Sequence, residues 1–178
     1  MYKRQVHNPT VLASETPLPV LVAALGPVML QIAGERADGT VLWMADEKAI
    51  GDHIAPKINK AAAEAGRTAP RIVAGIPVCL CANSEIDAAK DRANRILAEA
   101  ETSPNYQRLL DRGDARSVGD LCAAGDEESI LARFKAFADA GVTDLSVRLL
   151  PIGDNRDELI ASKYRTREVI AELAKAVR

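Results

Sequence analysis

The sequence predicts an α/β protein with a parallel sheet, and three observations lead to this fold class. Apolar runs of strand length alternate with longer segments of helical periodicity along most of the chain. Three of these runs are almost continuous in hydrophobic residues, which is typical of strands covered on both faces. The first run stops at Gly26-Pro27 and a helical pattern starts at once, with no polar loop between them. Such alternation implies parallel strands joined by right-handed crossovers.

Four apolar runs are predicted strands: 19–25, 40–45, 71–82 and 144–150. The fourth alternates more than the others, because Ser146 and Arg148 share one face. Pro77 interrupts the third run, so we expect that strand to be bent or to lie at an exposed edge. A charge on a strand needs a partner, so Arg148 either faces a phosphate or carboxylate or points outward beyond the core.

Helical patterns lie between the strands and after the last one. Pro27 suits the first position of a helix, because that position needs no N–H group. Ile50, Ile54 and Ile58 form one helical stripe, which Gly66 ends. The predicted helices are 27–37, 50–66, 84–101, 126–141 and 166–177.

We expect a structured insert at about 102–125, between the third predicted strand and the helix that precedes the fourth strand. Ser103-Pro104 predicts a helix start, Gly113 predicts its end, and 117–124 is a second short helical pattern. An excursion of this length favours a functional role. Tyr106 and Arg108 could reach a mouth above the sheet and contact substrate, whereas Tyr106 could equally anchor the insert against the sheet.

The segment AALGPVML, residues 23–30, is a candidate phosphate seat. Glycine at the end of a parallel strand lets the backbone approach a ligand closely. The following helix offers free N–H groups and a partial positive charge, which together attract an anion. The alternative is a tight turn with no ligand. A single glycine fits neither a Walker A loop nor the GxGxxG pattern.

Trp43 and the three cysteines are the other candidates with distinctive chemistry. Trp43, the only tryptophan, either lines a pocket and stacks on a ring or fills the core. Cys79 and Cys81 share a face of one strand but form no C-x-x-C motif, and no second pair completes a zinc site. We therefore expect these two cysteines, and Cys122, to be buried and inert.

Motifs that would name a catalytic or metal site are missing from the sequence, so catalytic residues are unknown at this stage. His7 and His53 each stand alone in the sequence, and His53 is expected to lie at the surface or to cap a helix. The net charge is −2 and the basic residues are dispersed, which argues against nucleic acid or an anionic membrane as a partner. An odd number of cysteines and the lack of a long apolar run favour a cytoplasmic protein.

Several segments resemble the bacterial luciferase-like monooxygenase superfamily, and within it the deazaflavin-dependent oxidoreductases. The resemblance covers about residues 17–178 and implies a (β/α)8 TIM-type barrel of about twice this length. The four predicted strands then match the fifth to eighth, so the chain is the C-terminal half. The segments that carry the resemblance are PVLVAALGPVMLQIAGERADGTVLWMA, HIAPKINKAAAEAGRTAPRIVAGIPV, SPNYQRLLDRG and DAGVTDLSV.

The resemblance also implies a cofactor and a site for it. In that family the turn after the fifth strand contacts the phosphate-bearing tail of the cofactor. The cofactor-binding candidates carried over are Ala23, Ala24, Leu25, Gly26 and Pro27, with Trp43 at the same end of the barrel. The implied cofactor is a deazaflavin (coenzyme F-420), with FMN as the alternative. The implied activity is hydride transfer between the cofactor and a small organic substrate. An FMN-dependent monooxygenase and an inactive truncated half-barrel are the alternatives.

The expected organisation is a leader or linker over residues 1–16, not native to the domain, followed by the half-barrel over 17–178. The residues around the reactive ring would lie in the first four strands, which this chain does not contain. Half a barrel leaves two open sheet edges and an uncovered apolar face. We therefore expect a homo-oligomer, a missing N-terminal half that completes the barrel, or marginal stability.

Overall fold

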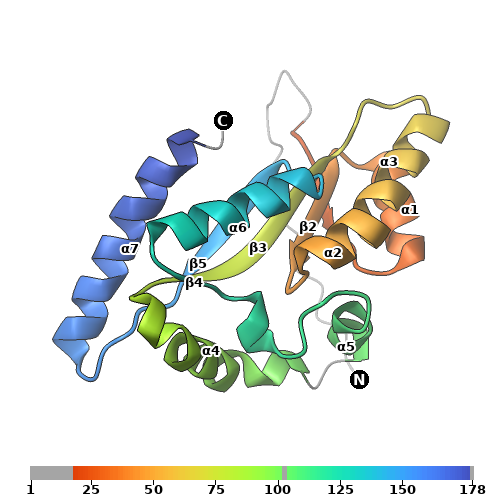
Figure 1. The fold of residues 1–178 in the computed structure, drawn as a ribbon. Helices are drawn as coiled ribbons and strands as arrows, with labels where there is room; N and C mark the ends of the chain where they lie inside the picture. Colours follow the sequence, from red (N-terminus) through yellow and green to blue (C-terminus); the bar gives the residue numbers. More distant parts are fainter. Residues whose placement is uncertain (1–17, 102–103, 177–178) are drawn as a thin grey trace, which may run out of the picture.

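A parallel sheet forms the centre of the protein in the computed structural model, which describes residues 18–101 and 104–176 (Figure 1). Four strands lie side by side in the order β1-β2-β3-β5, and a short strand, β4, pairs with the C-terminal end of β3. All four strand predictions are therefore confirmed, and β4 is an addition that the sequence did not predict. The strands are β1 (Leu21–Ala23), β2 (Gly39–Trp43), β3 (Arg71–Leu80), β4 (Ala123–Gly125) and β5 (Asp144–Leu149).

Helices connect the strands and extend into the insert. They are α1 (Pro27–Arg36), α2 (Glu47–Ala49), α3 (Ala55–Glu64), α4 (Ile86–Glu101), α5 (Pro104–Leu110), α6 (Glu127–Asp139) and α7 (Arg156–Ala176). A π-helical turn, Ile50–Ile54, joins α2 to α3. Short 3-10 turns cover Asn83–Glu85 and Val118–Leu121.

Two helical predictions differ from the structure. Helix α7 begins ten residues before the predicted start at 166, because Asn155 caps it by accepting from the backbone N–H groups of Asp157 and Glu158. Its first turns are largely exposed and carry no apolar stripe to mark them. In the insert, the pattern at 117–124 forms only a 3-10 turn and then β4, since residues 123–125 pair with β3.

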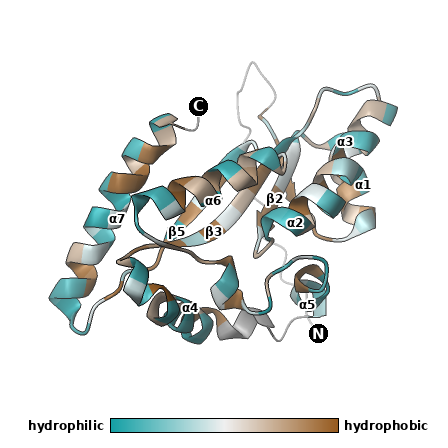
Figure 2. Cartoon of the chain, in the orientation of Figure 1, coloured by the Kyte–Doolittle hydropathy of each residue, from teal (hydrophilic) through white to brown (hydrophobic). Residues whose placement is uncertain are grey.

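The core lies between the sheet and the helices on one of its faces. Side chains of Leu42, Ile72, Ala74, Ile76 and Val78 point to that face and are almost fully buried. Figure 2 shows hydrophobic residues along the strands and hydrophilic residues on much of the outer helical surface. This one-sided packing fixes the direction in which each strand presents its alternate residues.

The second face of the sheet is only partly covered by the described residues. The expected burial on both faces is confirmed for β3 between Ala74 and Cys79 and is wrong for β1 and β2. Ala23, Ser146 and Arg148 are exposed, and Val41 keeps 39% of its surface accessible. Arg148 thus points away from the helix-covered core and forms no ion pair with the described residues. In a closed barrel this face would be the interior.

Pro77 lies inside a central strand, so its expected place at an exposed edge is wrong. Strand β2 pairs with β3 as far as Gly75, and β4 begins its pairing at Val78. Pro77 falls in the gap between these two partners, where a residue without an N–H group removes no ladder bond. On the other side of β3, the pairing with β5 continues past this point. Figure 1 shows β3 curving along its length.

The cysteines are free, and their surroundings make them poor nucleophiles. Cys79 and Cys122 are buried, as predicted, whereas Cys81 is half-buried. Burial raises the pKa of the Cys79 thiol well above its ordinary value and that of Cys122 to about 12. Because the thiolate is the reactive form, these two thiols are protonated and unreactive as nucleophiles at neutral pH.

Candidate functional site

A cleft of about 550 Å³ opens at the corner between β1 and α1. The structure brings the predicted corner together with the insert, including Arg108. Ala24 is the exception among the corner candidates, because its side chain is buried in the core. The residues that line the cleft are Ala23, Leu25, Gly26, Pro27, Val28, Met29, Asn105, Arg108, Leu109 and Arg112.

The corner itself is open and not filled by side chains. Gly26 precedes helix α1 in an extended conformation, no side chain caps the helix, and Pro27 occupies its first turn. A Cβ atom built on Gly26 would meet no other atom within 4 Å. The first N–H groups of α1 lack acceptors within the helix, so they are free for a ligand. The corner therefore has the features of an anion-binding site at a helix N-terminus.

Two arginines of the insert face this corner across the cleft. Arg108 donates from Nη2 to the side-chain oxygen of Asn105 at 2.6 Å. Neither Arg108 nor Arg112 forms an ion pair with a described carboxylate. Two guanidinium groups without a carboxylate partner, opposite a helix N-terminus, favour a phosphate or another anion.

His53 joins the corner to one of these arginines. Its side chain is 9% exposed, and Nη1 of Arg112 lies 2.6 Å from its Nδ1 and 2.5 Å from its Nε2. The ring also makes a hydrogen bond with the backbone of Leu25. The surface or capping position expected for His53 is therefore wrong, because the π-helical turn directs the ring inward.

The surroundings of His53 keep its ring neutral. Burial lowers the pKa of the imidazole below 6.5, and the charges of Arg112 and Lys57 lower it further. The bond with Leu25 favours the protonated ring but is outweighed. A neutral ring has a nitrogen lone pair that can accept from Arg112, which an imidazolium lacks. His53 can thus hold the guanidinium at the cleft.

Acidification from pH 7 to pH 5 is expected to destabilise the protein through His53. The unfolded ring takes up a proton near its ordinary pKa, and the folded ring does so only at lower pH. The unfolded state therefore binds more protons in this interval and gains stability. The urea concentration at the unfolding midpoint should fall between pH 7 and pH 5, and it should fall by a smaller amount in His53→Gln than in the unmodified chain. Glutamine is chosen because its amide can still donate and accept hydrogen bonds. Equal pH dependence in the two proteins would contradict this role of His53.

Asp46 anchors the segment that follows α5. Its Oδ1 accepts from the N–H of Ala49 at 2.8 Å, and its Oδ2 accepts from the N–H groups of Asp114 and Ala115 at 2.7 and 2.9 Å. A Cβ atom on Gly113 would collide with the Asp46 carboxylate. One buried carboxylate thus ties the turn after β2 to the turn that carries Arg112.

Trp43 and Tyr106 lie outside this cleft, in a separate apolar cluster. Both side chains are half-buried and pack against a group made of Met44, Leu97, Leu110, Val118 and Leu121. A Cβ atom on Gly75 would come within 2.5 Å of Cε3 of Trp43, so the glycine makes room for the indole. The cluster attaches the insert to the sheet. Contact of Trp43 with a cofactor, and of Tyr106 with substrate, stays a prediction.

Comparison with known proteins places this geometry in a family. The profile of the family described as luciferase-like monooxygenase matches residues 2–144. The chain belongs to the luciferase-like monooxygenase family. A curated relative, the 5,10-methylenetetrahydromethanopterin reductase of Methanopyrus kandleri, is 25% identical in an alignment 168 residues long that covers 80% of this chain and 48% of that protein. The luciferase-like chain thus spans about half the length of this relative.

Solved structures share the fold. The coenzyme F420 dependent tetrahydromethanopterin reductase from Methanopyrus kandleri matches with a TM-score of 0.56 and 24% identity, over 88% of this chain and 51% of that one. An F420-dependent secondary alcohol dehydrogenase, in complex with an F420-acetone adduct, gives 0.60 and 14%, over 88% and 50%. The oxygenating constituent of 3,6-diketocamphane monooxygenase from Pseudomonas putida, with FMN, gives 0.53 and 20%, over 79% and 43%. The predicted partial TIM-type barrel is confirmed.

The described residues of this luciferase-like chain contain neither a cluster of metal ligands nor a helix suited to crossing a membrane. Over 18–101 and 104–176, no three histidine, cysteine, aspartate or glutamate side chains gather as metal ligands would. In the same ranges, no helix combines the length and the hydrophobicity that crossing a membrane requires.

Proposed function

We propose that the chain is the C-terminal half of a deazaflavin-dependent oxidoreductase and that the β1–α1 cleft binds the phosphate-bearing tail of the cofactor. The observation that carries the proposal is the open Gly26 corner facing Arg108 and Arg112. Two structural neighbours support the choice of cofactor, because F420 appears in the names of both. The complete enzyme would transfer hydride between the deazaflavin and a small organic substrate.

The chain's own residues have positioning roles in this proposal. The first turn of α1 and the two guanidinium groups hold the dianionic tail. His53 and Asp46 keep Arg112 and its turn in place. A bound deazaflavin would supply the hydride-carrying ring, while the protein orients it and excludes water. Tyr106 is proposed to line the substrate side from the insert.

FMN is the second candidate cofactor, because one structural neighbour is an FMN complex and FMN also ends in a phosphate. Absorbance separates the two, since bound FMN peaks near ~450 nm and a deazaflavin near ~420 nm. We expect the chain to retain F420 more tightly than FMN after equilibrium dialysis. Retention of FMN alone would favour the monooxygenase. Retention of neither, even with the remaining half supplied, would favour an inactive fragment.

We also propose that a second barrel half, from another copy or from the missing N-terminal half, covers the second face of the sheet. Strands β1 and β5 each pair on one side only within the described residues. Open edges and a partly apolar face promote association. Light scattering should therefore give about twice the mass of a monomer at micromolar concentration. A stable monomer at that concentration would contradict self-association.

A further inference from the structure

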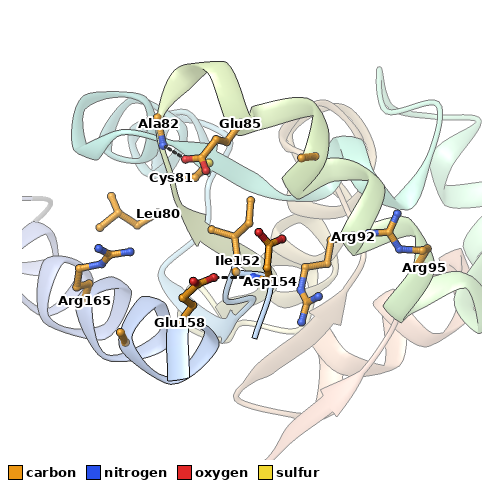
Figure 3. A pocket seen from close by; sticks show the side chains of 13 residues that line it. Leu80, Cys81, Ala82, Glu85, Arg92, Arg95, Ile152, Asp154, Glu158 and Arg165 are labelled. Atoms are coloured by element: carbon orange, nitrogen blue, oxygen red, sulfur yellow. Dashed lines mark hydrogen bonds between the residues drawn. The ribbon is translucent and has the colours of Figure 1, made fainter. Parts of the chain in front are cut away.

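A second cavity, of about 810 Å³, lies at the C-terminal ends of β3 and β5 (Figure 3). Its walls come from helix α4 on one side and helix α7 on the other. Leu80 and Cys81 close it at the end of β3, and Ile152 closes it after β5. The cavity shares no lining residue with the β1–α1 cleft. Its volume is in the range of small-molecule sites, and active sites of parallel barrels lie at this end of the strands.

Three carboxylates and three arginines line this cavity, and two of the carboxylates hold backbone N–H groups in place. Glu85 accepts a hydrogen bond from the N–H of Ala82 at 2.9 Å, and Glu158 accepts one from the N–H of Asp154 at 2.8 Å. Figure 3 shows both bonds as dashed lines. These two carboxylates serve the starts of their own helical segments. Only the carboxylate of Asp154 remains without a hydrogen-bond donor among the described residues.

The three arginines of the cavity make no contact of this kind within the described part of the chain. Arg92 and Arg95 come from α4 and Arg165 comes from α7, and none of the three forms an ion pair or hydrogen bond with the described residues. The Nε atom of Arg92 is buried and has no acceptor. A buried N–H without an acceptor is uncommon in folded proteins, because it loses its bonds to water and gains none. Among the described residues, none of these three guanidinium groups therefore has a carboxylate within ion-pair distance, although three carboxylates line the same cavity.

We propose that this cavity binds a small dianion, with one carboxylate or phosphate group on Arg92 and the other on Arg165. Figure 3 shows Arg165 on the α7 side and Arg92 on the α4 side, with Glu158 and Asp154 between them, so the proposed ligand would have an anionic group at each end and span the cavity. Guanidinium groups suit both anions, because their planar fork donates two parallel hydrogen bonds. The apolar side chains of Leu80 and Ile152 would contact the short carbon chain of a dicarboxylate. This site is independent of the proposed cofactor cleft.

Calorimetric titration of the full chain with succinate, pyrophosphate and inorganic phosphate tests the proposal. We expect succinate or pyrophosphate to bind, and whichever binds tighter identifies the chemical source. Neutral succinamide should not bind. The double variant R92Q/R165Q should raise the dissociation constant at least about tenfold. In R36Q, which removes an exposed arginine outside both cavities, the constant should be unchanged.

A second variant tests the same site in case R92Q/R165Q does not fold. Ala161 lines the cavity from an exposed position of α7, so Ala161→Glu adds a carboxylate and leaves every arginine in place. We expect it to weaken binding as strongly as R92Q/R165Q, while F420 or FMN retention at the β1–α1 cleft is unchanged. The proposal is overturned if no dianion binds at about 10 mM, or if R36Q weakens binding as much as R92Q/R165Q. Unaltered binding in Ala161→Glu would overturn it as well.

Discussion

Gly26→Asp is expected to weaken cofactor binding at least about tenfold, which corresponds to about 1.4 kcal/mol. The added carboxylate would stand at the helix N-terminus where the proposed phosphate tail lies, so two negative charges would meet at short range. The fold should tolerate the change, because Gly26 is exposed, its φ of −95° suits any residue, and a Cβ atom there has space. Equilibrium dialysis with F420 and FMN measures the effect.

Gly26→Ala is the matched control, since it adds the same Cβ atom without charge. We expect its cofactor affinity to stay near that of the unmodified chain, and the unfolding midpoints of both variants to be similar. If Gly26→Asp binds the cofactor as well as Gly26→Ala does, the tail lies elsewhere and the β1–α1 cleft is not the site.

Asp46→Ala is expected to destabilise the chain by about 3 kcal/mol. The side chain is 6% exposed and satisfies three backbone N–H groups, which the methyl group of alanine cannot replace. Each donor left without an acceptor costs about 1–3 kcal/mol, with partial relief where water enters. Urea unfolding measures the loss. Trypsin should also cleave faster after Arg112, because the turn that carries it would no longer be fixed.

Asp126→Ala provides the comparison for this result. Asp126 caps α6 by accepting from the N–H of Ser129, much as Asp46 caps α2, but it holds no part of the turn that carries Arg112. Loss of such a cap costs about 1 kcal/mol. A similar loss of stability in both variants, with equal trypsin cleavage after Arg112, would show that Asp46 is only a helix cap.

Runs and stripes of apolar residues predicted most of the fold, because apolar residues in such patterns are the ones that become buried. The strands at 71–80 and 39–43 are long and apolar, and the stripe of Ile50, Ile54 and Ile58 matches one buried helical face. Strand β4 escaped prediction because Ala123–Gly125 is short and small, and pairing with β3 alone makes it a strand. The start of α7 escaped because its first turns are exposed and polar.

The candidate site was predictable only where its chemistry is local. Gly26-Pro27 marks the corner within two residues, and Arg108 stood out within the insert. Contacts of Arg112 and Asp46 could not be inferred, because their partners are 59 and 68 residues away along the chain. No spacing rule links such positions, and only the packing of the insert against the sheet brings them together.

The π-helical turn at 50–54 changes the direction in which the side chains after it point around the helix axis. One additional residue in a helix rotates everything after it by about 100° around the axis. Ile58 and the remainder of α3 can therefore face α1 while His53, only five positions earlier, turns toward Leu25. Loss of a single codon here would restore regular winding, and the imidazole and the downstream isoleucine could no longer both be oriented as they are.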